Sequence, residues 1–168
     1  MASAVVVAGG RSTRFAGGEK ALAPLDGRPM LARIVDRLAP VVDAVVVNCR
    51  PDQRGPFEAA LPGAVTLAVD DRLDAGPLAG LRTGLAAAPD PSAVVVACDM
   101  PFVDPGLVEF LLDAVRSGGR EAVLPRPNDW FQPLQAAYRV GPIVAAADAA
   151  LAAGCGRPLA AVERLDAA

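Results

Sequence analysis

The sequence predicts a Rossmann-like α/β fold of three layers (α/β/α), with helices on both faces of a mainly parallel sheet. Short apolar runs rich in valine alternate along the chain with segments in which apolar residues recur at helical spacing. This alternation is typical of βαβ units. The length of 168 residues suits a single domain over residues 1–168, and its core must be aliphatic because 53% of the residues are hydrophobic but only 4% are aromatic.

Five apolar runs are the candidate strands, because a short continuous apolar run is the signature of a strand buried on both faces. They are residues 4–7, 44–47, 65–69, 93–97 and 122–124. The candidate helices are residues 29–38, 78–88 and 105–116, together with the alanine-rich segment 145–153. Ligands of open α/β sheets bind beyond the carboxyl ends of the strands, so we expect the polar residues that follow these runs to converge.

The first predicted strand leads into a loop rich in glycine and arginine. Gly9 and Gly10 allow the backbone to approach a ligand closely. Inward-facing backbone N–H groups form an anion-binding concavity, and Arg11, Arg14 and Lys20 supply cations around it. Lys20 is the only lysine among sixteen basic residues, and its compact charge suits a phosphate group that changes geometry. The alternative is the chance survival of one lysine on a solvated loop.

The spacing of this loop differs from two common phosphate loops. A Walker A loop needs Gly-Lys before Ser or Thr, and a dinucleotide fingerprint needs G-x-G-x-x-G, neither of which is present. Residues 7–15, followed by Gly17, Gly18 and Lys20, instead resemble the signature L-A-G-G-x-S-x-R-x-G-x-x-K of nucleotidyltransferases that activate phosphorylated compounds. Val7 replaces the leading leucine.

Asp99 follows the fourth apolar run and is the strongest single candidate after the loop. A carboxylate at the tip of a buried strand can hold Mg²⁺ against triphosphate oxygens, and a chain without histidine must hold a metal through oxygen. The alternative is a turn or a helix cap, although Asp104 is better placed to cap a helix from Pro105. The same family has C-D-x-P here with the aspartate as metal ligand, and residues 98–101 match it.

The segment Gly76-Pro77-Leu78-Ala79-Gly80, preceded by Asp71, resembles the molybdenum cofactor guanylyltransferases and implies guanine as the base. The resemblance also implies that Asn48 and Asp71 contact the nucleotide. A carboxylate can accept hydrogen bonds from the guanine N1–H and 2-amino groups, but which acidic residue does so is left open. The alternative is that Asn48 and Asp71 are polar turn residues at strand ends.

Gln132-Pro133-Leu134 resembles the family's segment near the acceptor substrate, where other members often have His-Pro-Leu. Trp130 or Phe131 would then stack on a flat pterin. The alternative is an aromatic cluster that closes the sheet edge. Family members also carry an N-x-N-T-P-E-D segment near the C-terminus, which this sequence does not contain.

The resemblance implies a nucleotide-diphospho-sugar transferase-like fold and a Mg²⁺-dependent guanylyltransferase that joins GMP from GTP to molybdopterin and releases pyrophosphate. Alternatives are a guanylyltransferase for adenosylcobinamide phosphate or another small molecule, or a GTP-binding domain without catalysis. Lys20, Arg14 and Asp99 would be catalytic. The acceptor would be free or delivered by another protein, and Gln132, Pro133 and Trp130 would bind it. The residues implied in nucleotide binding are Val7, Ala8, Gly9, Gly10, Arg11, Ser12, Lys20, Asn48, Asp71 and Asp99.

The composition disfavours other classes of partner. The net charge of −3 and the lack of a basic stripe argue against nucleic acid, and no apolar run approaches the length of a membrane span. Three scattered cysteines without a C-x-x-C pair argue against a disulfide framework and a zinc site. We expect no signal peptide and a cytoplasmic protein with reduced thiols.

Overall fold

The computed structural model describes residues 1–10, 18–72 and 75–168. The strands are β1 (Ser3–Val7), β2 (Pro24–Leu25), β3 (Arg28–Pro29), β4 (Ala44–Cys49), β5 (Thr66–Val69), β6 (Ser92–Ala97), β7 (Ala122–Val123) and β8 (Gln135–Arg139). The α-helices are α1 (Met30–Leu38), α2 (Arg54–Ala60), α3 (Pro77–Ala86), α4 (Pro105–Ser117), α5 (Val140–Ala152) and α6 (Pro158–Val162). Three short 3₁₀ helices in the described chain are η1 (Lys20–Leu22), η2 (Pro51–Gln53) and η3 (Pro127–Asp129).

Within the described residues, the main sheet has six strands in the order β5-β4-β1-β6-β8-β7. β1 lies at its centre and pairs in parallel with β4 and β6, so that Val5 lies opposite Val46 and Val95. β5 extends the parallel part beyond β4, whereas β8 runs antiparallel to both β6 and β7. The predicted α/β fold with a mainly parallel sheet is therefore confirmed.

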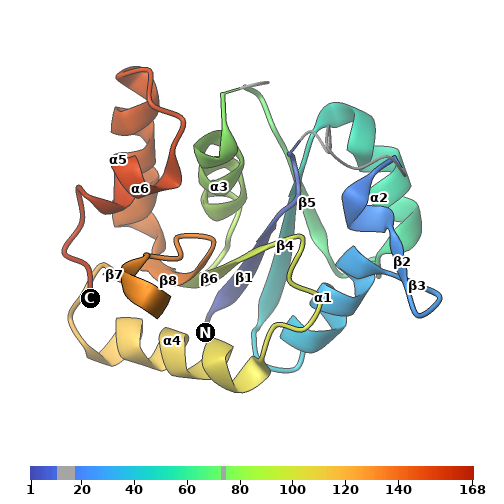
Figure 1. The fold of residues 1–168 in the computed structure, drawn as a ribbon, viewed down its shortest axis with the longest axis horizontal. Coiled ribbons are helices and arrows are strands. Elements are labelled where there is room, and N and C mark those ends of the chain that lie inside the picture. Colours follow the sequence, from blue (N-terminus) through green and yellow to red (C-terminus); the bar gives the residue numbers. More distant parts are fainter. Residues whose placement is uncertain (11–17, 73–74) are drawn as a thin grey trace.

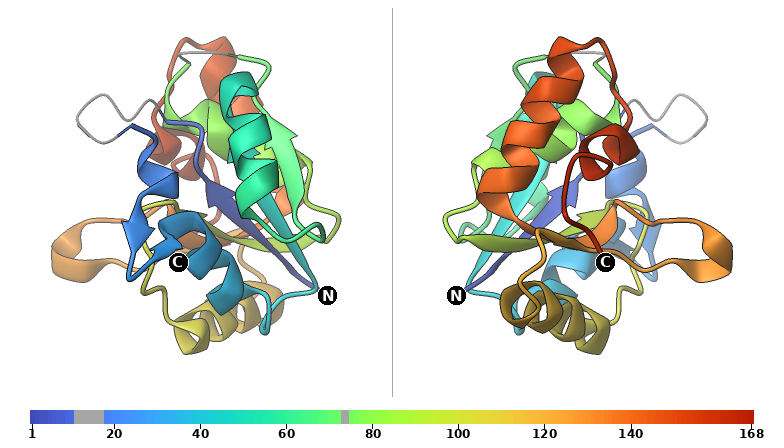
Figure 2. Two further views of the ribbon diagram at one scale, coloured as in Figure 1. Left: turned by 90° about the vertical axis from the view of Figure 1, so that its right-hand side faces the viewer. Right: turned by 90° about the vertical axis from the view of Figure 1, so that its left-hand side faces the viewer.

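Helices cover both faces of this sheet (Figures 1 and 2). Alternate residues of β1 enter two separate cores because successive side chains of a strand point to opposite faces. Ala4 and Val6 pack in the core under α1, α2 and α4. Val5 and Val7 pack in the core under α3, α5 and α6. Both cores are aliphatic, as the composition predicts, and Phe57 and Tyr138 are the fully buried aromatic residues among those described.

The structure differs from the predicted elements at strand ends, at helix α5, which begins at Val140 rather than at residue 145, and in four further elements that are absent from the prediction, namely β2, β3, α2 and α6. β4 continues through Asn48 to Cys49, two residues beyond the valine run, because Asn48 and Cys49 pair with Ala68 and Val69 of β5. β8 was not predicted, since its sequence QAAYR has neither a valine run nor a clean alternation. None of the helices in the described part of the chain is both long and apolar enough to cross a bilayer.

Helix α3 lies unusually close to the sheet, and two of its glycines allow this. A Cβ atom at Gly84 would lie 2.4 Å from Cγ1 of Val5, and one at Gly80 would lie 2.5 Å from Oδ1 of Asn48. Both contacts are far inside van der Waals distance, and Val5 and Asn48 are fully buried. The backbone of α3 therefore depends on the absence of side chains at these positions.

We predict that Gly84→Ala lowers the free energy of unfolding by about 1–3 kcal/mol, because the added methyl overpacks a rigid core. Urea denaturation measures it. The matched control is Gly106→Ala in the first turn of α4, where the new Cβ would meet Asp104 at an ordinary 3.4 Å. This control should raise stability by up to about 1 kcal/mol through helix propensity. Equal effects of the two substitutions would contradict the close approach.

Candidate functional site

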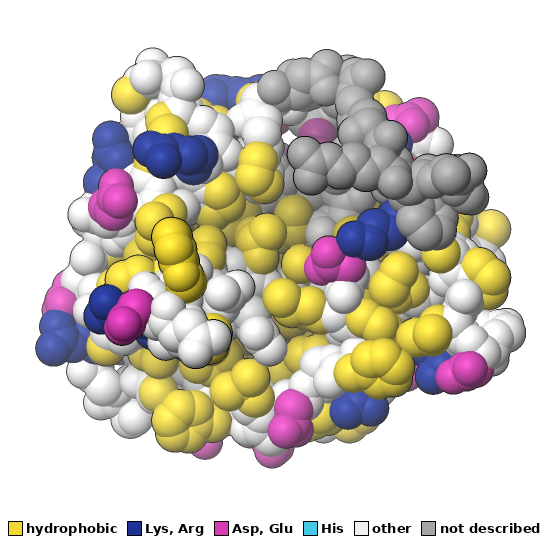
Figure 3. All heavy atoms as spheres, in the orientation of Figure 1, with side chains coloured by type: hydrophobic (Ala, Val, Ile, Leu, Met, Phe, Trp, Pro, Cys, Tyr) yellow, Lys and Arg dark blue, Asp and Glu magenta, His cyan; other side chains and the backbone are white. Residues whose placement is uncertain are grey.

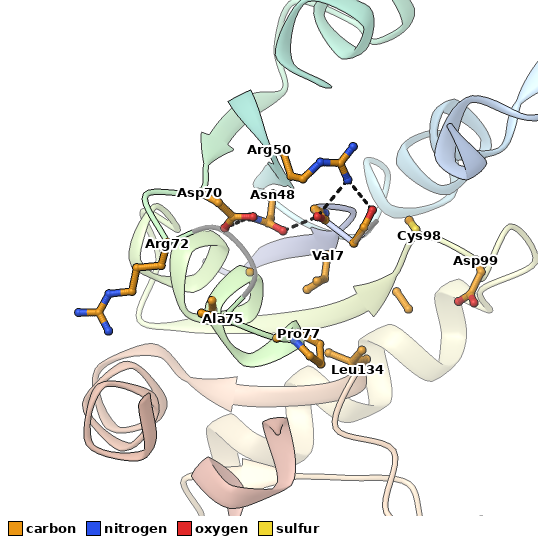
Figure 4. Close-up of a pocket in the computed structure, with 16 residues that line it drawn as sticks. Val7, Asn48, Arg50, Asp70, Arg72, Ala75, Pro77, Cys98, Asp99 and Leu134 are labelled. Carbon is orange, nitrogen blue, oxygen red and sulfur yellow. Dashed lines mark hydrogen bonds between the residues drawn. The ribbon is translucent and has the colours of Figure 1, made fainter. Parts of the chain in front are cut away.

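A cleft of about 460 Å³ opens at the carboxyl ends of the parallel strands. Its walls come from the segments that follow β1, β4, β5 and β6, from the first turn of α3 and from Leu134 before β8 (Figure 4). Apolar side chains cover much of the hollowed face in this orientation (Figure 3). The described residues that line it are Val7, Gly9, Gly10, Asn48, Arg50, Asp70, Arg72, Ala75, Gly76, Pro77, Ala79, Gly80, Ala97, Cys98, Asp99 and Leu134. The predicted convergence of polar residues at strand ends is therefore found.

Asn48 forms part of the back of this cleft from inside strand β4, where it is fully buried. Its side-chain Oδ1 accepts a hydrogen bond from the Gly9 N–H at 3.1 Å. Its Nδ2 donates to Asp70 Oδ1 at 2.7 Å and to the Ala68 carbonyl at 3.4 Å (Figure 4). Asn48 therefore lies in a strand, not in a turn, and its side chain connects the end of β1 to the end of β5.

Asp70, rather than its neighbour Asp71, lines the cleft. Asp71 is exposed, whereas Asp70 is half-buried beside Gly9. A Cβ atom at Gly9 would lie 2.4 Å from Asp70 Oδ2 and 2.8 Å from Asn48 Oδ1, so any larger residue would displace these side chains. Burial raises the pKa of Asp70 above its ordinary value, although hydrogen bonds from Asn48 and Thr83 act in the opposite direction.

Asp99 lines the other end of the cleft, and Lys20, which is not a lining residue, pairs with it there. The distance between Lys20 Nζ and Asp99 Oδ2 is 2.9 Å, and the side chains are 38% and 49% exposed. The hydrogen bond to Asp99 raises the pKa of Lys20, so the amine stays charged. Asp99 lines the cleft, while Asp104 caps α4 by accepting a hydrogen bond from the Gly106 N–H at 2.9 Å. Asp104 therefore fills the cap position that was the alternative role for Asp99.

The thiol of Cys98 also lines the cleft, directly before Asp99. Burial raises its pKa to about 11. A thiol with that pKa is protonated at neutral pH and is a poor nucleophile.

Arg50 is a cleft residue that sequence reasoning missed. It lies one residue beyond β4, and its guanidinium donates to the carbonyl oxygens of Gly9 and Gly10 at 3.2 and 2.5 Å (Figure 4). No motif marks it, because it contacts backbone atoms of another segment. The one signal for Arg50 in the sequence is that it comes shortly after a predicted strand.

The residues predicted to bind the acceptor lie in the loop between β7 and β8, which projects from the body (Figure 2). Trp130 is 74% exposed. Gln132 and Pro133 are half-buried and, unlike Leu134, do not line the cleft. The Tyr138 hydroxyl donates to the Pro133 carbonyl at 2.7 Å, which fixes the end of the loop beside the cleft.

Three further predicted site residues, Arg11, Ser12 and Arg14, lie outside the described residues. Val7, Gly9 and Gly10 line the cleft, and Ala8 is buried directly behind them. In the described part of the chain, no group of three or more carboxylate or thiol side chains encloses a possible metal position.

Comparison with known proteins gives consistent results. The model of the MobA-like NTP transferase domain matches residues 4–166. The chain is 45% identical over 163 residues to a probable molybdenum cofactor guanylyltransferase of Natronomonas pharaonis, covering 96% of this chain and 80% of that protein. It is 44% identical over 131 residues to the protein of the same name from Haloferax mediterranei, covering 77% of this chain and 61% of that protein.

A solved structure is also similar over nearly the whole chain. It is the molybdopterin-guanine dinucleotide biosynthesis protein A from Archaeoglobus fulgidus, with a TM-score of 0.81 and 29% identity. The match covers 99% of this chain and 81% of that one.

We predict that Asp70→Asn raises the melting temperature at pH 7. The folded pKa of Asp70 is raised, so its ionised form destabilises the folded state above that pKa, and the effect disappears as pH falls through it. The amide oxygen of the new Asn can still accept from Asn48. The gain over wild type should therefore shrink between pH 7 and pH 4, as measured by calorimetry.

The exposed neighbour provides the control for this substitution. Asp71→Asn should change stability by less than about 0.5 kcal/mol, as surface substitutions usually do. An Asp70→Asn variant that is less stable than wild type by the same amount at every pH would show that the carboxylate carries no burial penalty.

Proposed function

The chain belongs to the MobA-like NTP transferase family, and from this we propose that it is a guanylyltransferase that transfers GMP from GTP to molybdopterin in its molybdenum form. The products are the molybdopterin guanine dinucleotide cofactor and pyrophosphate. The names of the two archaeal relatives support this reaction. The observation that carries the proposal is the Lys20–Asp99 pair at a cleft that begins with the glycines after β1. On this proposal, residues 1–168 form one NTP transferase domain, and its cytoplasmic location stays a prediction.

GTP would occupy the length of the cleft. Its triphosphate would lie over Gly9 and Gly10 and reach toward Lys20 and Asp99, where cationic and metal-binding groups are available. Its base would lie toward Asp70, whose carboxylate can accept hydrogen bonds from the guanine N1–H and 2-amino groups. The separation of Asp70 and Asp99 to opposite sides of the cleft in Figure 4 supports this orientation. Of the two adjacent acidic residues, Asp70 is therefore the better candidate for the base contact than Asp71.

The residues at the Asp99 end fit a magnesium ion that arrives with the nucleotide. Mg²⁺ is commonly bound through one or two carboxylates together with substrate phosphates and water. Asp99 supplies one half-exposed carboxylate beside the expected phosphate position. When bound, Mg²⁺ would neutralise phosphate charge. Lys20 Nζ pairs with the carboxylate of Asp99 in the free protein. With the nucleotide bound, the same ammonium group would contact a phosphate oxygen instead.

The reaction needs no strong base from the protein. The terminal phosphate of the acceptor is already anionic near neutral pH, so its oxygen can attack the α-phosphorus of GTP in line while the bond to pyrophosphate breaks. Lys20 and Arg14 would stabilise the charge on the leaving pyrophosphate. Catalysis then consists of positioning and charge stabilisation. The sequence has no histidine and the thiol of Cys98 is neutral, which agrees with this chemistry.

The acceptor would approach from the side of the β7–β8 loop. Leu134 lines the cleft, and Gln132, Pro133 and Trp130 precede it along the same loop. Trp130 is exposed and offers a free face for stacking on a pterin. Phe131 is also exposed, and Arg126 lies over its ring at 5.1 Å from the ring centre.

Other acceptors are distinguished by a pyrophosphate-release assay. The purified protein is incubated with GTP, Mg²⁺ and either the molybdenum form of molybdopterin or adenosylcobinamide phosphate. Release with the first acceptor alone supports the proposal, and release with the second supports the corrinoid alternative. Tight GTP binding in calorimetry without release on any acceptor would support a GTP-binding domain without catalysis.

We predict that Lys20→Ala and Asp99→Ala each lower kcat by about two to four orders of magnitude, since each removes a charged group from the reacting phosphates. Both side chains are partly exposed, so the fold should survive, as checked by thermal melting. The matched control is Arg54→Ala, which breaks the exposed Arg54–Glu58 ion pair on α2 and should leave kcat unchanged. Wild-type turnover by either site variant would refute the proposed function.

We further predict that Asp70→Asn lowers kcat/KM for GTP by about 10-fold to 100-fold, because loss of a hydrogen bond to a charged group is worth about 1.5–3 kcal/mol. The same variant should change kcat/KM for ATP little, since adenine lacks the paired donors. Steady-state kinetics with both nucleotides measure this. If Asp71→Asn rather than Asp70→Asn produced the loss, the base contact would belong to Asp71.

A further inference from the structure

Arg50 contacts the chain on both sides of residues 11–17. Its Nη1 donates to the carbonyl oxygens of Gly9 and Gly10 at 3.2 and 2.5 Å. Its Nη2 donates to Glu19 Oε2 at 3.3 Å. Its side chain is only 16% exposed, and the bonds to Gly9 and Glu19 are partly buried, where hydrogen bonds are stronger than at the surface.

The donors of this guanidinium are fully used by these contacts and by Asp52. Nε and Nη2 donate to Asp52 Oδ1 and Oδ2, both at 3.0 Å. An arginine side chain has five N–H donors. Two from Nη1 reach the glycine carbonyls, two from Nη2 reach Glu19 and Asp52, and the one on Nε reaches Asp52. Arg50 therefore lines the cleft without a donor left for a phosphate.

The segment after β4 also satisfies the neighbouring backbone carbonyl. Gln53 Nε2 donates to the Ala8 carbonyl at 3.0 Å. The carbonyl oxygens of three successive residues, Ala8, Gly9 and Gly10, thus all face Arg50 and Gln53. Free carbonyl oxygens beside the cleft would repel a polyanion, and here all three accept hydrogen bonds, two of them from a positively charged guanidinium.

We propose that Arg50 is a positioning residue for the nucleoside triphosphate: it fixes Gly9, Gly10 and Glu19 relative to one another so that this part of the cleft accepts phosphate groups. Lysine cannot replace it, because an ammonium lacks the planar fork that reaches several acceptors at once. The choice of a triphosphate as ligand rests on the proposed function. The contacts by which Arg50 connects Gly9 and Gly10 to Glu19 do not depend on that function, because they are present in the free protein.

The test compares Arg50→Lys with Arg33→Lys. Arg33 is a matched control, because its Nε donates to the Leu25 carbonyl at 2.7 Å and its Nη2 to Asp26 at 3.3 Å in a turn that does not line the cleft. Hydrogen exchange of the free proteins is followed at the amides of residues 9–10 and 19–22. Calorimetry then measures the binding of GTP and of guanosine.

Arg50→Lys should exchange at least about tenfold faster at these amides than wild type, and it should bind GTP about tenfold to a hundredfold more weakly, as expected for loss of one charged hydrogen bond. Guanosine binding should stay within about twofold of wild type, because the base does not contact this segment. Arg33→Lys should match wild type in all three measurements. Should Arg50→Lys fail to melt cooperatively, Glu19→Gln replaces it, since it releases one side of the bridge and should show a smaller loss of the same kind.

Unchanged exchange and GTP affinity in Arg50→Lys would overturn the inference. Equal losses for GTP and guanosine would also overturn it, because they would indicate a general structural defect. If the wild-type protein bound no GTP, the proposed function would fail, and the exchange measurement would decide the bridging role by itself.

Discussion

The side-chain amide of Asn48 connects the ends of three structural elements at the back of the cleft. It accepts from Gly9 after β1, donates to Asp70 after β5, and lies directly under Gly80 of α3. A buried amide that loses a partner is costly, at about 1–3 kcal/mol for each unsatisfied group. The bonds of Asn48 therefore fix the first glycine turn and the buried carboxylate together, and α3 can cover them only because Gly80 has no side chain.

The charges of the cleft follow from this arrangement. Asp70 and Asp99 lie at the two ends of the cleft. The guanidinium of Arg50 donates its hydrogen bonds to backbone carbonyls and carboxylates of the protein itself. Lys20 pairs with Asp99 at the cleft and can exchange this carboxylate for a phosphate, and Arg72 is an exposed cation that lines the cleft. Such a site has little capacity for acid–base chemistry. It is suited to a reaction whose nucleophile and leaving group are both already anionic phosphates.

Sequence patterns predicted the parts of this structure that depend on local chemistry. The valine runs predicted β1, β4 and β6, and the topology of parallel strands brings the residues after them together, as expected.

The patterns could not show that β4 continues through Asn48, because pairing with β5 and not local propensity extends it. The choice between Asp70 and Asp71 also depends on tertiary packing. Arg50 follows a predicted strand, but no motif marks it, and its hydrogen bonds to the Gly9 and Gly10 carbonyls cannot be recognised from residue types. β8 is placed by its neighbours β6 and β7, and its own sequence is weakly strand-like.

The single tryptophan of the chain lies in the loop that leads into the cleft wall through Leu134. Its indole is 74% exposed, whereas Tyr138 is fully buried in strand β8, which follows the same loop. Emission excited at long ultraviolet wavelengths therefore arises from one solvated chromophore. The intensity and wavelength of this emission therefore report the binding of a ligand at the β7–β8 loop, without any label attached to the protein.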